Sequence, residues 1–181
     1  VDLSAAVHDT TSLIRASIGR TVRLELQMSM GLPIVEGDLT QIRQIIMNLV
    51  VNARDAIGDT GKVTIETDLV TIDARYCADH VEAVQGIYVL LAVSDDGCGI
   101  DATTLPHLFE PFFTTKERGT GLGLATVFTI VSQHQGSIAV RSEPRKGTTF
   151  TVYLPFSSQG DLSAPVDAGS AASLRGSQGS Q

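Results

Sequence analysis

Two asparagines in one predicted helix are the first residues whose types and spacing could do chemistry. Asn48 and Asn52 stand in the run Asn-Leu-Val-Val-Asn-Ala-Arg-Asp-Ala, which ends at Ala56. Residues four apart project from the same face of a helix, so the two amides should lie side by side. An amide oxygen can ligate Mg²⁺, and an amide nitrogen can donate to phosphate. A solvated helix face would carry the same residues, and this pattern alone leaves both interpretations open.

A carboxylate at the end of an apolar strand is the second candidate. Asp95 opens the string Asp-Asp-Gly-Cys-Gly-Ile, directly after the apolar run 87–93. A carboxylate there can accept a hydrogen bond from the exocyclic amine of adenine, whereas guanine presents a carbonyl at that position. The glycines allow the backbone to approach a ligand closely. An ordinary turn after a strand has a similar composition, so the string is weak by itself.

Two further segments could complete a nucleotide site. The run 107–116 reads His-Leu-Phe-Glu-Pro-Phe-Phe-Thr-Thr-Lys, in which a proline between aromatic residues can anchor a mobile loop, or the rings can be core. The run 119–124 reads Gly-Thr-Gly-Leu-Gly-Leu and opens a predicted helix. Amides at a helix start bind phosphate, and glycines permit a hinged lid. Three glycines in five residues are more than a plain loop before a helix requires.

Several other nucleotide and metal motifs are excluded. Gly61-Lys62 lacks both the earlier glycine and the following Ser or Thr of a P-loop. The third glycine of the run 119–123 comes one residue too early for a dinucleotide fingerprint. Asp95–Gly97 offers too few ligands for a calcium loop, and the two cysteines lack the partners of a zinc site.

Length and charge bound the class of protein. The 181 residues are 43% apolar and 18% charged, which predicts one main globular domain. A net charge of −7 disfavours nucleic acid and anionic membrane as partners. No apolar run is long enough to cross a membrane, and Cys77 and Cys98 suit a reducing compartment. The sequence lacks an initiator methionine, so we expect it to be a piece of a longer protein.

The elements that must position these motifs mix helices and strands without regular alternation. Periodicity predicts helices over 3–18, 40–57 (capped by Asp38) and from the glycine loop to about 135. It predicts strands over 22–28, 62–72, 87–93, 137–140 and 148–154. This order favours an α+β fold with helices on one face of a largely antiparallel sheet. Residues 157–181 are rich in Ser, Gly, Ala and Gln, which predicts a disordered linker or tail.

Together, the four motifs and the later string Gly147-Thr-Thr-Phe150 resemble the N, G1, F, G2 and G3 boxes of the GHKL ATPase and kinase superfamily. The resemblance covers roughly residues 24–156. It implies the Bergerat ATP-binding fold, an α/β sandwich with a mixed, mostly antiparallel sheet. It implies ATP and Mg²⁺ as cofactors, with Asn52 as the Mg²⁺ ligand and Asp95 as the residue that reads adenine.

The same resemblance implies a wider set of site residues. Asn48 and Lys116 are the expected catalytic side chains. The expected nucleotide-binding residues are Asn48, Asn52, Asp55, Asp95, Gly97, Gly99, Ile100, Phe113, Thr115, Lys116, Gly119, Thr120, Gly121, Leu122, Gly123, Leu124 and Thr149.

One residue selects a branch of the superfamily. Gyrase-type, mismatch-repair and chaperone members carry a glutamate four residues before the Mg²⁺ asparagine, where it activates water. Asn48 occupies that position here and cannot take a proton at neutral pH. Asparagine there resembles sensor histidine kinases, and the strings Asn-Ala-Arg-Asp-Ala and Pro-Phe-Phe-Thr-Thr-Lys are similar to their nitrogen-regulator and hybrid group. Asp55 departs from the basic residue that many members carry, leaving phosphate charge to Mg²⁺, helix amides and Lys116 or Arg118.

The resemblance also sets the expected domains and partners. Residues 1–20 are expected to be the end of a dimerisation hairpin or its linker, and 21–156 the catalytic ATP-binding domain. The acceptor histidine is missing, and we interpret His134, before Gln135-Gly136, as structural. The expected partners are ATP, the protein's own phosphoacceptor hairpin, and a response regulator or receiver domain. The domain is expected to be cytoplasmic and to make no membrane contact, whether or not the parent is membrane-anchored.

Three functions remain to be separated. The first is a protein histidine kinase domain, which donates the γ-phosphate of ATP to a histidine outside the sequence. The second is a degenerate nucleotide-binding interaction module, which the presence of Asn52 and Asp95 disfavours. The third is an ATP hydrolase, which Asn48 disfavours.

Overall fold

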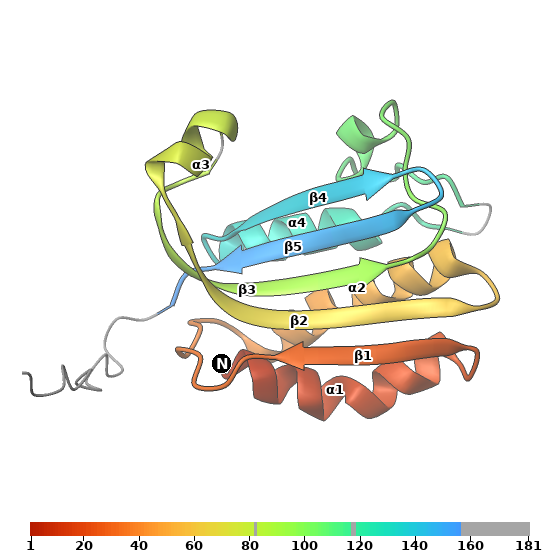
Figure 1. Ribbon diagram of the computed structural model, residues 1–181, viewed down its shortest axis with the longest axis horizontal. Helices are drawn as coiled ribbons and strands as arrows, with labels where there is room; N and C mark the ends of the chain where they lie inside the picture. The colour runs from red at the N-terminus through yellow and green to blue at the C-terminus, as the bar shows by residue number, and fades with distance from the viewer. Residues whose placement is uncertain (82, 117–118, 157–181) are drawn as a thin grey trace, which may run out of the picture.

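The computed structural model describes residues 1–81, 83–116 and 119–156, so the predicted tail 157–181 lies outside the described residues. Within them, five strands form one sheet in the order β1-β2-β3-β5-β4 (Figure 1). β1 is parallel to β2, and the other neighbours are antiparallel. The expected mixed, mostly antiparallel sheet is confirmed. The strands are β1 (Val22–Met28), β2 (Gly61–Ile72), β3 (Gly86–Asp95), β4 (Ser137–Glu143) and β5 (Gly147–Leu154).

The long helices cover one face of this sheet (Figure 1). They are α1 (Leu3–Ile18), α2 (Leu39–Ile57) and α4 (Gly123–Gln133), with α2 packed between the other two. The short helix α3 (Ala74–Asp79) and the 3₁₀ turn η1 (Leu105–His107) lie in connections. This is the predicted α+β class. Among the described residues, none of the helices is both long enough and apolar enough to cross a membrane.

The sequence of α2 explains its central place. The Asp38 carboxylate accepts a hydrogen bond from the Gln41 N–H at 3.0 Å, which caps the helix as predicted. An apolar stripe along the helix is buried against the sheet and α1. It consists of Ile42, Ile45, Ile46, Leu49, Val50 and Ala53. The polar residues Asn48, Asn52 and Asp55 lie beside this stripe, so burial of the stripe fixes where they point.

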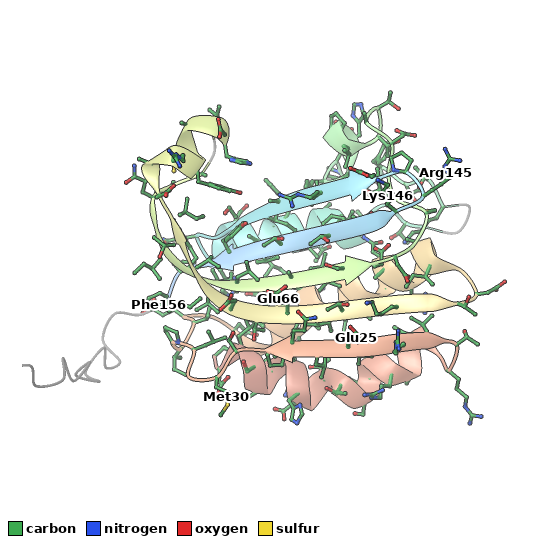
Figure 2. All side chains as sticks on the ribbon, viewed as in Figure 1. Glu25, Met30, Glu66, Arg145, Lys146 and Phe156 are labelled. Atoms are coloured by element: carbon green, nitrogen blue, oxygen red, sulfur yellow. The ribbon has the colours of Figure 1, made fainter. Side chains whose placement is uncertain are left out.

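The sheet presents its apolar side to the helices and a polar side to solvent. Burial alternates along β5, where each second residue from Thr148 to Leu154 is buried. On the uncovered face, Glu25 lies within 3.5 Å of the Lys62 ammonium (Figure 2). Figure 2 also shows Arg145 and Lys146 at the β4–β5 turn, the end of the sheet that carries the candidate site.

Residues 1–20 do not stand apart from the core. Leu3, Val7, Ile14 and Ile18 of α1 are buried in the main apolar cluster. The polar stretch in this helix is accommodated because the Thr10 hydroxyl donates to the Ala6 carbonyl at 2.6 Å. The segment therefore packs as part of the same unit as 21–156. Its assignment to a hairpin end or linker concerns the longer protein and stays a prediction.

The β2–β3 hairpin extends beyond its neighbours and carries α3 at its tip (Figure 1). β3 pairs with β2 from Gly86 onward, but with β5 only from Val89 onward. The overhang rests on the sheet through Tyr88, whose ring meets Tyr153 edge-on at a centroid distance of 6.4 Å. Burial, with the neighbouring Tyr76 hydroxyl, raises the pKa of Tyr153 to about 12.

Candidate functional site

The four motifs meet at one end of the sheet. The Cys98 N–H donates to the Ala56 carbonyl at 3.0 Å, which joins the loop after β3 to the end of α2. The Asn48 side-chain N–H donates to the Gly123 carbonyl at 3.3 Å, which joins α2 to the start of α4. The Lys116 ammonium donates to Asn52 Oδ1 at 2.8 Å. Segments far apart in the sequence are therefore held around the C-terminal half of α2.

Asp95 ends β3 with its side chain on the helix side of the sheet. The Gly97 N–H donates to its Oδ1 at 2.9 Å. Burial raises the pKa of this carboxyl above its usual range, and the negative charge of Asp96 raises it further. Hydrogen bonds from the backbone N–H groups of Gly97 and Thr148 partly oppose this rise in pKa. A partly buried carboxylate with remaining lone pairs can accept a further hydrogen bond from a ligand.

The β4–β5 turn fixes the loop after Asp95. The Ile100 N–H donates to Ser142 Oγ at 2.8 Å, and Ser142 Oγ donates to the Gly147 carbonyl at 3.0 Å. Ser142 and the neighbouring Thr148, whose hydroxyl lies 2.8 Å from Ser142 Oγ, were not predicted as site residues. A serine on a polar strand gives no signal in the sequence, because its importance depends on which loop lies opposite.

Thr149 is not brought to the site. It pairs across the ladder with Ser94, its hydroxyl lies 2.8 Å from that of Ser94, and both are on the uncovered face of the sheet. Thr148 is the threonine that pairs with Asp95, and it is 5% exposed on the helix side. Side chains alternate between the two faces of a sheet, so a prediction that is wrong by one residue along β5 selects a side chain on the opposite face.

The G1 glycines are required by the protein's own packing. A Cβ at Gly97 would lie 2.5 Å from the Ala56 carbonyl carbon, so no side chain fits there. Gly99 has φ +70°, and a Cβ there would collide with the Glu143 carbonyl. Their identity thus explains the close approach of the loop to α2 and to the β4–β5 turn. It is not by itself evidence of a ligand.

The lid glycines divide into two kinds. Gly121 has φ +70°, its carbonyl accepts from the Phe112 N–H at 2.9 Å, and a Cβ there would strike the Phe112 backbone. At Gly123, a Cβ would meet no atom within 4 Å. Gly123 begins α4, and Leu122 before it provides no side-chain cap. The first amides of α4 are therefore free of a capping side chain, as an anion-binding helix start requires.

Asp55 forms two ion pairs. Its Oδ2 lies 2.7 Å from the Lys116 ammonium, and its Oδ1 lies 2.9 Å from the Arg54 guanidinium. Partial burial favours the neutral acid, but the hydrogen bonds and charges of Lys116 and Arg54 outweigh it and lower the pKa of Asp55. Lys116 thus supplies, from another segment, the positive charge that the sequence lacks at position 55.

The remaining predicted residues lie around this group. Ile100 and Leu124 pack partly against the core. Phe113 meets the His107 ring at a centroid distance of 5.6 Å. The Thr120 hydroxyl accepts from the Leu122 N–H at 3.4 Å. Gly119 is partly buried, and Thr115 is exposed beside Lys116.

His134 has the structural role expected from the sequence. Its Nδ1 lies 2.8 Å from the Ile130 carbonyl, and its Nε2 accepts from the Asp38 N–H at 3.3 Å. The ring lies over Gly37, where a Cβ would collide with it. His134 therefore joins the end of α4 to the start of α2 and takes no part in the candidate site.

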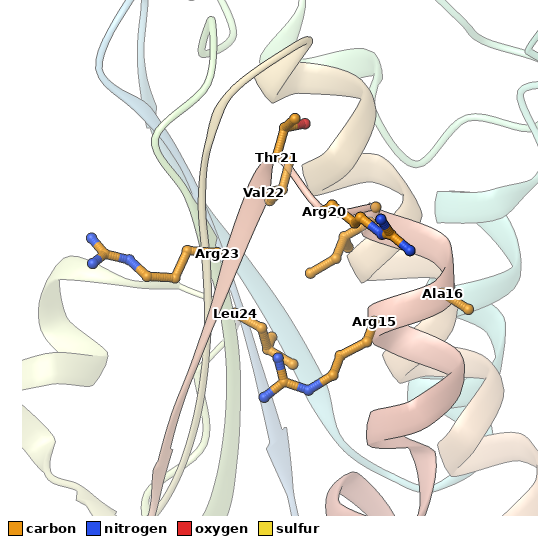
Figure 3. A pocket seen from close by; sticks show the side chains of 9 residues that line it. Arg15, Ala16, Arg20, Thr21, Val22, Arg23 and Leu24 are labelled. Carbon is orange, nitrogen blue, oxygen red and sulfur yellow. The ribbon is translucent and has the colours of Figure 1, made fainter.

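A separate cavity of about 670 Å³ opens between the end of α1 and β1 (Figure 3). Figure 3 shows Arg15 reaching from α1 toward Leu24, whereas Arg23 points away on the other side of the strand. Its lining contains none of the predicted site residues.

Within the described ranges, no group of three or more His, Cys, Asp or Glu side chains could hold a metal. The oxygens that α2 would offer a metal here are the amide oxygen of Asn52 and the carboxylate of Asp55, which lie together around the Lys116 ammonium. Hard cations such as Mg²⁺ are commonly held this way, by few protein ligands plus phosphate.

Comparison with known proteins decides the family. The sequence profile described as "Histidine kinase-, DNA gyrase B-, and HSP90-like ATPase" matches residues 37–158. The chain belongs to this ATPase family. Its match spans α2 through β5, and so contains every predicted site residue.

Curated relatives are bacterial sensor kinases. Over 86% of its own length, this chain is 39% identical to the sensor kinase CckA of Brucella abortus. It is 36% identical over 89% of its length to the histidine-protein kinase AtoS of Escherichia coli. The chain spans only 17% and 24% of these two relatives, so most of each relative has no counterpart here.

Solved structures of histidine kinases share the fold. Full-length ShkA in complex with AMPPNP superposes with a TM-score of 0.68 at 26% identity, covering 86% of this chain and 30% of ShkA. The nucleotide-free catalytic domain of ThkA superposes with a TM-score of 0.62 at 28% identity, covering 84% of this chain and 89% of that domain. The predicted Bergerat-type fold is thereby confirmed.

Proposed function

We propose that this chain binds ATP with Mg²⁺ and donates the γ-phosphate to a histidine on a dimerisation hairpin outside the sequence, in two-component signal transduction. The observation that carries the proposal is the meeting of Asp95, Asn52 and the start of α4 in one site of a family member. The partners would be that hairpin and a response regulator or receiver domain. The relatives' names as sensor kinases support this assignment. With this function the domain would act in the cytoplasm.

Each part of ATP has a matching group. Asp95 would accept from the adenine amine at the end of β3. The uncapped amides at the start of α4 would bind phosphate, because they carry the partial positive charge of the helix. Lys116 would meet a phosphate oxygen with its ammonium, and is our candidate catalytic side chain.

The donor set fits Mg²⁺. The Asn52 amide oxygen and the Asp55 carboxylate already hold a cation, the Lys116 ammonium, at 2.8 and 2.7 Å. Oxygen ligands of this kind suit a hard cation, and Asn52 and Asp55 are the residues that would hold it. When bound, Mg²⁺ neutralises charge on the transferred phosphoryl group.

Asn48 favours a histidine over water as acceptor. Its amide cannot serve as a base, and its N–H is bonded to the Gly123 carbonyl, which gives it a positioning role between α2 and α4. An imidazole nitrogen is already nucleophilic. In the transfer, a bond forms from that nitrogen to the γ-phosphorus while the bond to the β–γ bridging oxygen breaks, which releases ADP.

Two measurements separate this function from its alternatives. Titration calorimetry with ATP and Mg²⁺ should show binding, and binding without transfer to an added acceptor hairpin would indicate a degenerate nucleotide-binding module. Incubation with γ-labelled ATP and an added acceptor hairpin should label the hairpin. Rapid release of free phosphate without the hairpin would instead indicate an ATP hydrolase.

A further inference from the structure

The Lys116 ammonium lies between two oxygens of α2. It donates to Asn52 Oδ1 at 2.8 Å and to Asp55 Oδ2 at 2.7 Å. Asn52 and Asp55 are three residues apart on the helix, so they form one surface. Lys116 comes from a segment more than 60 residues away along the chain, so this contact depends on the tertiary fold.

This contact is better shielded than the Lys146–Glu143 pair at the same end of the molecule. The side chains of Lys116 and Asp55 are 39% and 28% exposed, whereas those of Lys146 and Glu143 are 77% and 64% exposed. Arg54 occupies the other oxygen of Asp55 at 2.9 Å. The Lys116 ammonium is thus left with Asp55 Oδ2, and it donates to the amide oxygen of Asn52 as well.

We propose that Lys116 is a built-in occupant of the cation site formed by Asn52 and Asp55, and that Mg²⁺ displaces it when Mg²⁺–nucleotide binds. The inference rests on the proposed function, since that function places Mg²⁺ at Asn52. Mg²⁺ at these two oxygens would lie close to the ammonium that they now hold, and two cations at such distances repel each other strongly. Mg²⁺ and Lys116 therefore compete.

Displacement gives the lysine its second role. An ammonium released from Asn52 keeps its three donors and its charge, and its flexible stem can carry it to a phosphate oxygen. In the nucleotide-free protein the same ammonium balances the charge of Asp55. Mg²⁺ alone should bind poorly, because it displaces a cation without offering the lysine a new partner; nucleotide offers that partner.

Titration of Mg²⁺ without nucleotide tests the competition. The ¹H–¹⁵N signal of the Asn52 side-chain amide reports binding in the wild type, Lys116→Gln and the matched control Lys146→Gln. Lys116→Gln should bind Mg²⁺ roughly 1.5- to fivefold more tightly than the wild type, the range expected for removal of a partly exposed ion pair. Lys146→Gln removes the same charge from an exposed pair and should match the wild type. Equal Mg²⁺ affinity in the wild type and Lys116→Gln would overturn the inference.

The lysine itself gives a second readout. In the nucleotide-free protein, the Lys116 ¹⁵N ammonium signal should be observable and lost in Asp55→Asn. Addition of AMPPNP with Mg²⁺ should shift it. A signal that is unchanged by bound AMPPNP and Mg²⁺ would contradict displacement and leave ATP binding itself established. If AMPPNP does not bind at all, the proposed function fails, and the titration with Mg²⁺ alone still decides the competition.

Discussion

At Asp95, the proposed role in nucleotide recognition and the stability of the fold make opposite demands. We expect Asp95→Asn to reduce ATP affinity by about tenfold to a hundredfold, because a hydrogen bond to a charged acceptor contributes about 1.5–3 kcal/mol. The same change should remove discrimination against GTP. Titration calorimetry with both nucleotides measures this, and unchanged ATP affinity would show that Asp95 does not read adenine.

The stability of the nucleotide-free protein should move the other way. Burial raises the pKa of Asp95, so the folded state binds this proton more tightly than the unfolded state. The ionised carboxylate therefore costs stability at neutral pH, and the cost disappears as pH falls through the raised pKa. We expect Asp95→Asn to be at least as stable as the wild type in urea at pH 7. A clear loss of stability there would contradict the burial argument.

Gly123 separates a ligand requirement from a folding requirement. A Cβ at position 123 would contact no neighbouring atom, so the fold does not require glycine there. Gly123→Ala should therefore fold, with a stability equal to that of the wild type or higher by about 0.5 kcal/mol. If phosphate approaches this backbone, ATP affinity should fall at least severalfold. Gly97→Ala is the matched contrast, because it should unfold or destabilise the protein. Normal ATP affinity in Gly123→Ala would exclude a close phosphate contact.

Residue types and spacing were enough to predict part of this site. The sequence predicts where Asn52 and Asp95 point, because Asn52 lies within the periodic apolar pattern of α2 and Asp95 comes at the end of an apolar strand; their roles toward a ligand stay predictions. The pairing of Asp55 with Lys116 could not be predicted, because a loop contact across the fold has no periodic signature. The sequence predicts Thr149 as a site residue, but Thr148 is the threonine that faces the helices, because the motif does not reveal which of the two points inward.

At the scale of elements, His134 is one of the contacts that join α4 to α2, at the end of α4 and the start of α2. His134→Ala should destabilise the fold by about 1–2 kcal/mol, because it removes the ring over Gly37 and leaves the Asp38 N–H without its acceptor. His8→Ala, on an exposed position of α1, is the control. Urea denaturation compares the two variants. Equal stability would show that the ring contributes nothing to this junction.

Most elements were predictable because their patterns are strong. The stripe of α2 and the alternation of β5 gave their type and nearly their ends. Strand β4 runs to Glu143, whereas the sequence predicts that it ends at 140. Arg141–Glu143 are polar and carry no strand pattern, but they pair with β5 and so extend the strand. Helix α3 was not predicted, since it spans only 6 residues and buries none of them.

At the scale of the whole molecule, the proposed function implies that the two routes for the γ-phosphate, to histidine and to water, are both blocked in this chain alone. We expect it to bind ATP without labelling itself or releasing phosphate rapidly, because the acceptor hairpin is missing and Asn48 cannot activate water. An acceptor hairpin on a separate chain should become labelled, though weakly, because the effective concentration of a tethered acceptor is lost. Incubation with γ-labelled ATP measures both. Stable label on His8 or His134 of the chain alone would contradict this division.

The overhang of β2 and β3 has a consequence for hydrogen exchange. Residues 86–88 of β3 have no partner in β5. The overhang contacts the sheet at Tyr153, through the Tyr88 ring and the neighbouring Tyr76 hydroxyl. It can therefore open as a small cooperative unit while the core stays closed. Amide protons over 69–72 and 86–88 should exchange with deuterium faster than those over 63–67 and 89–93. Their exchange should be insensitive to bound nucleotide, since the overhang lies at the opposite end of β3 from Asp95.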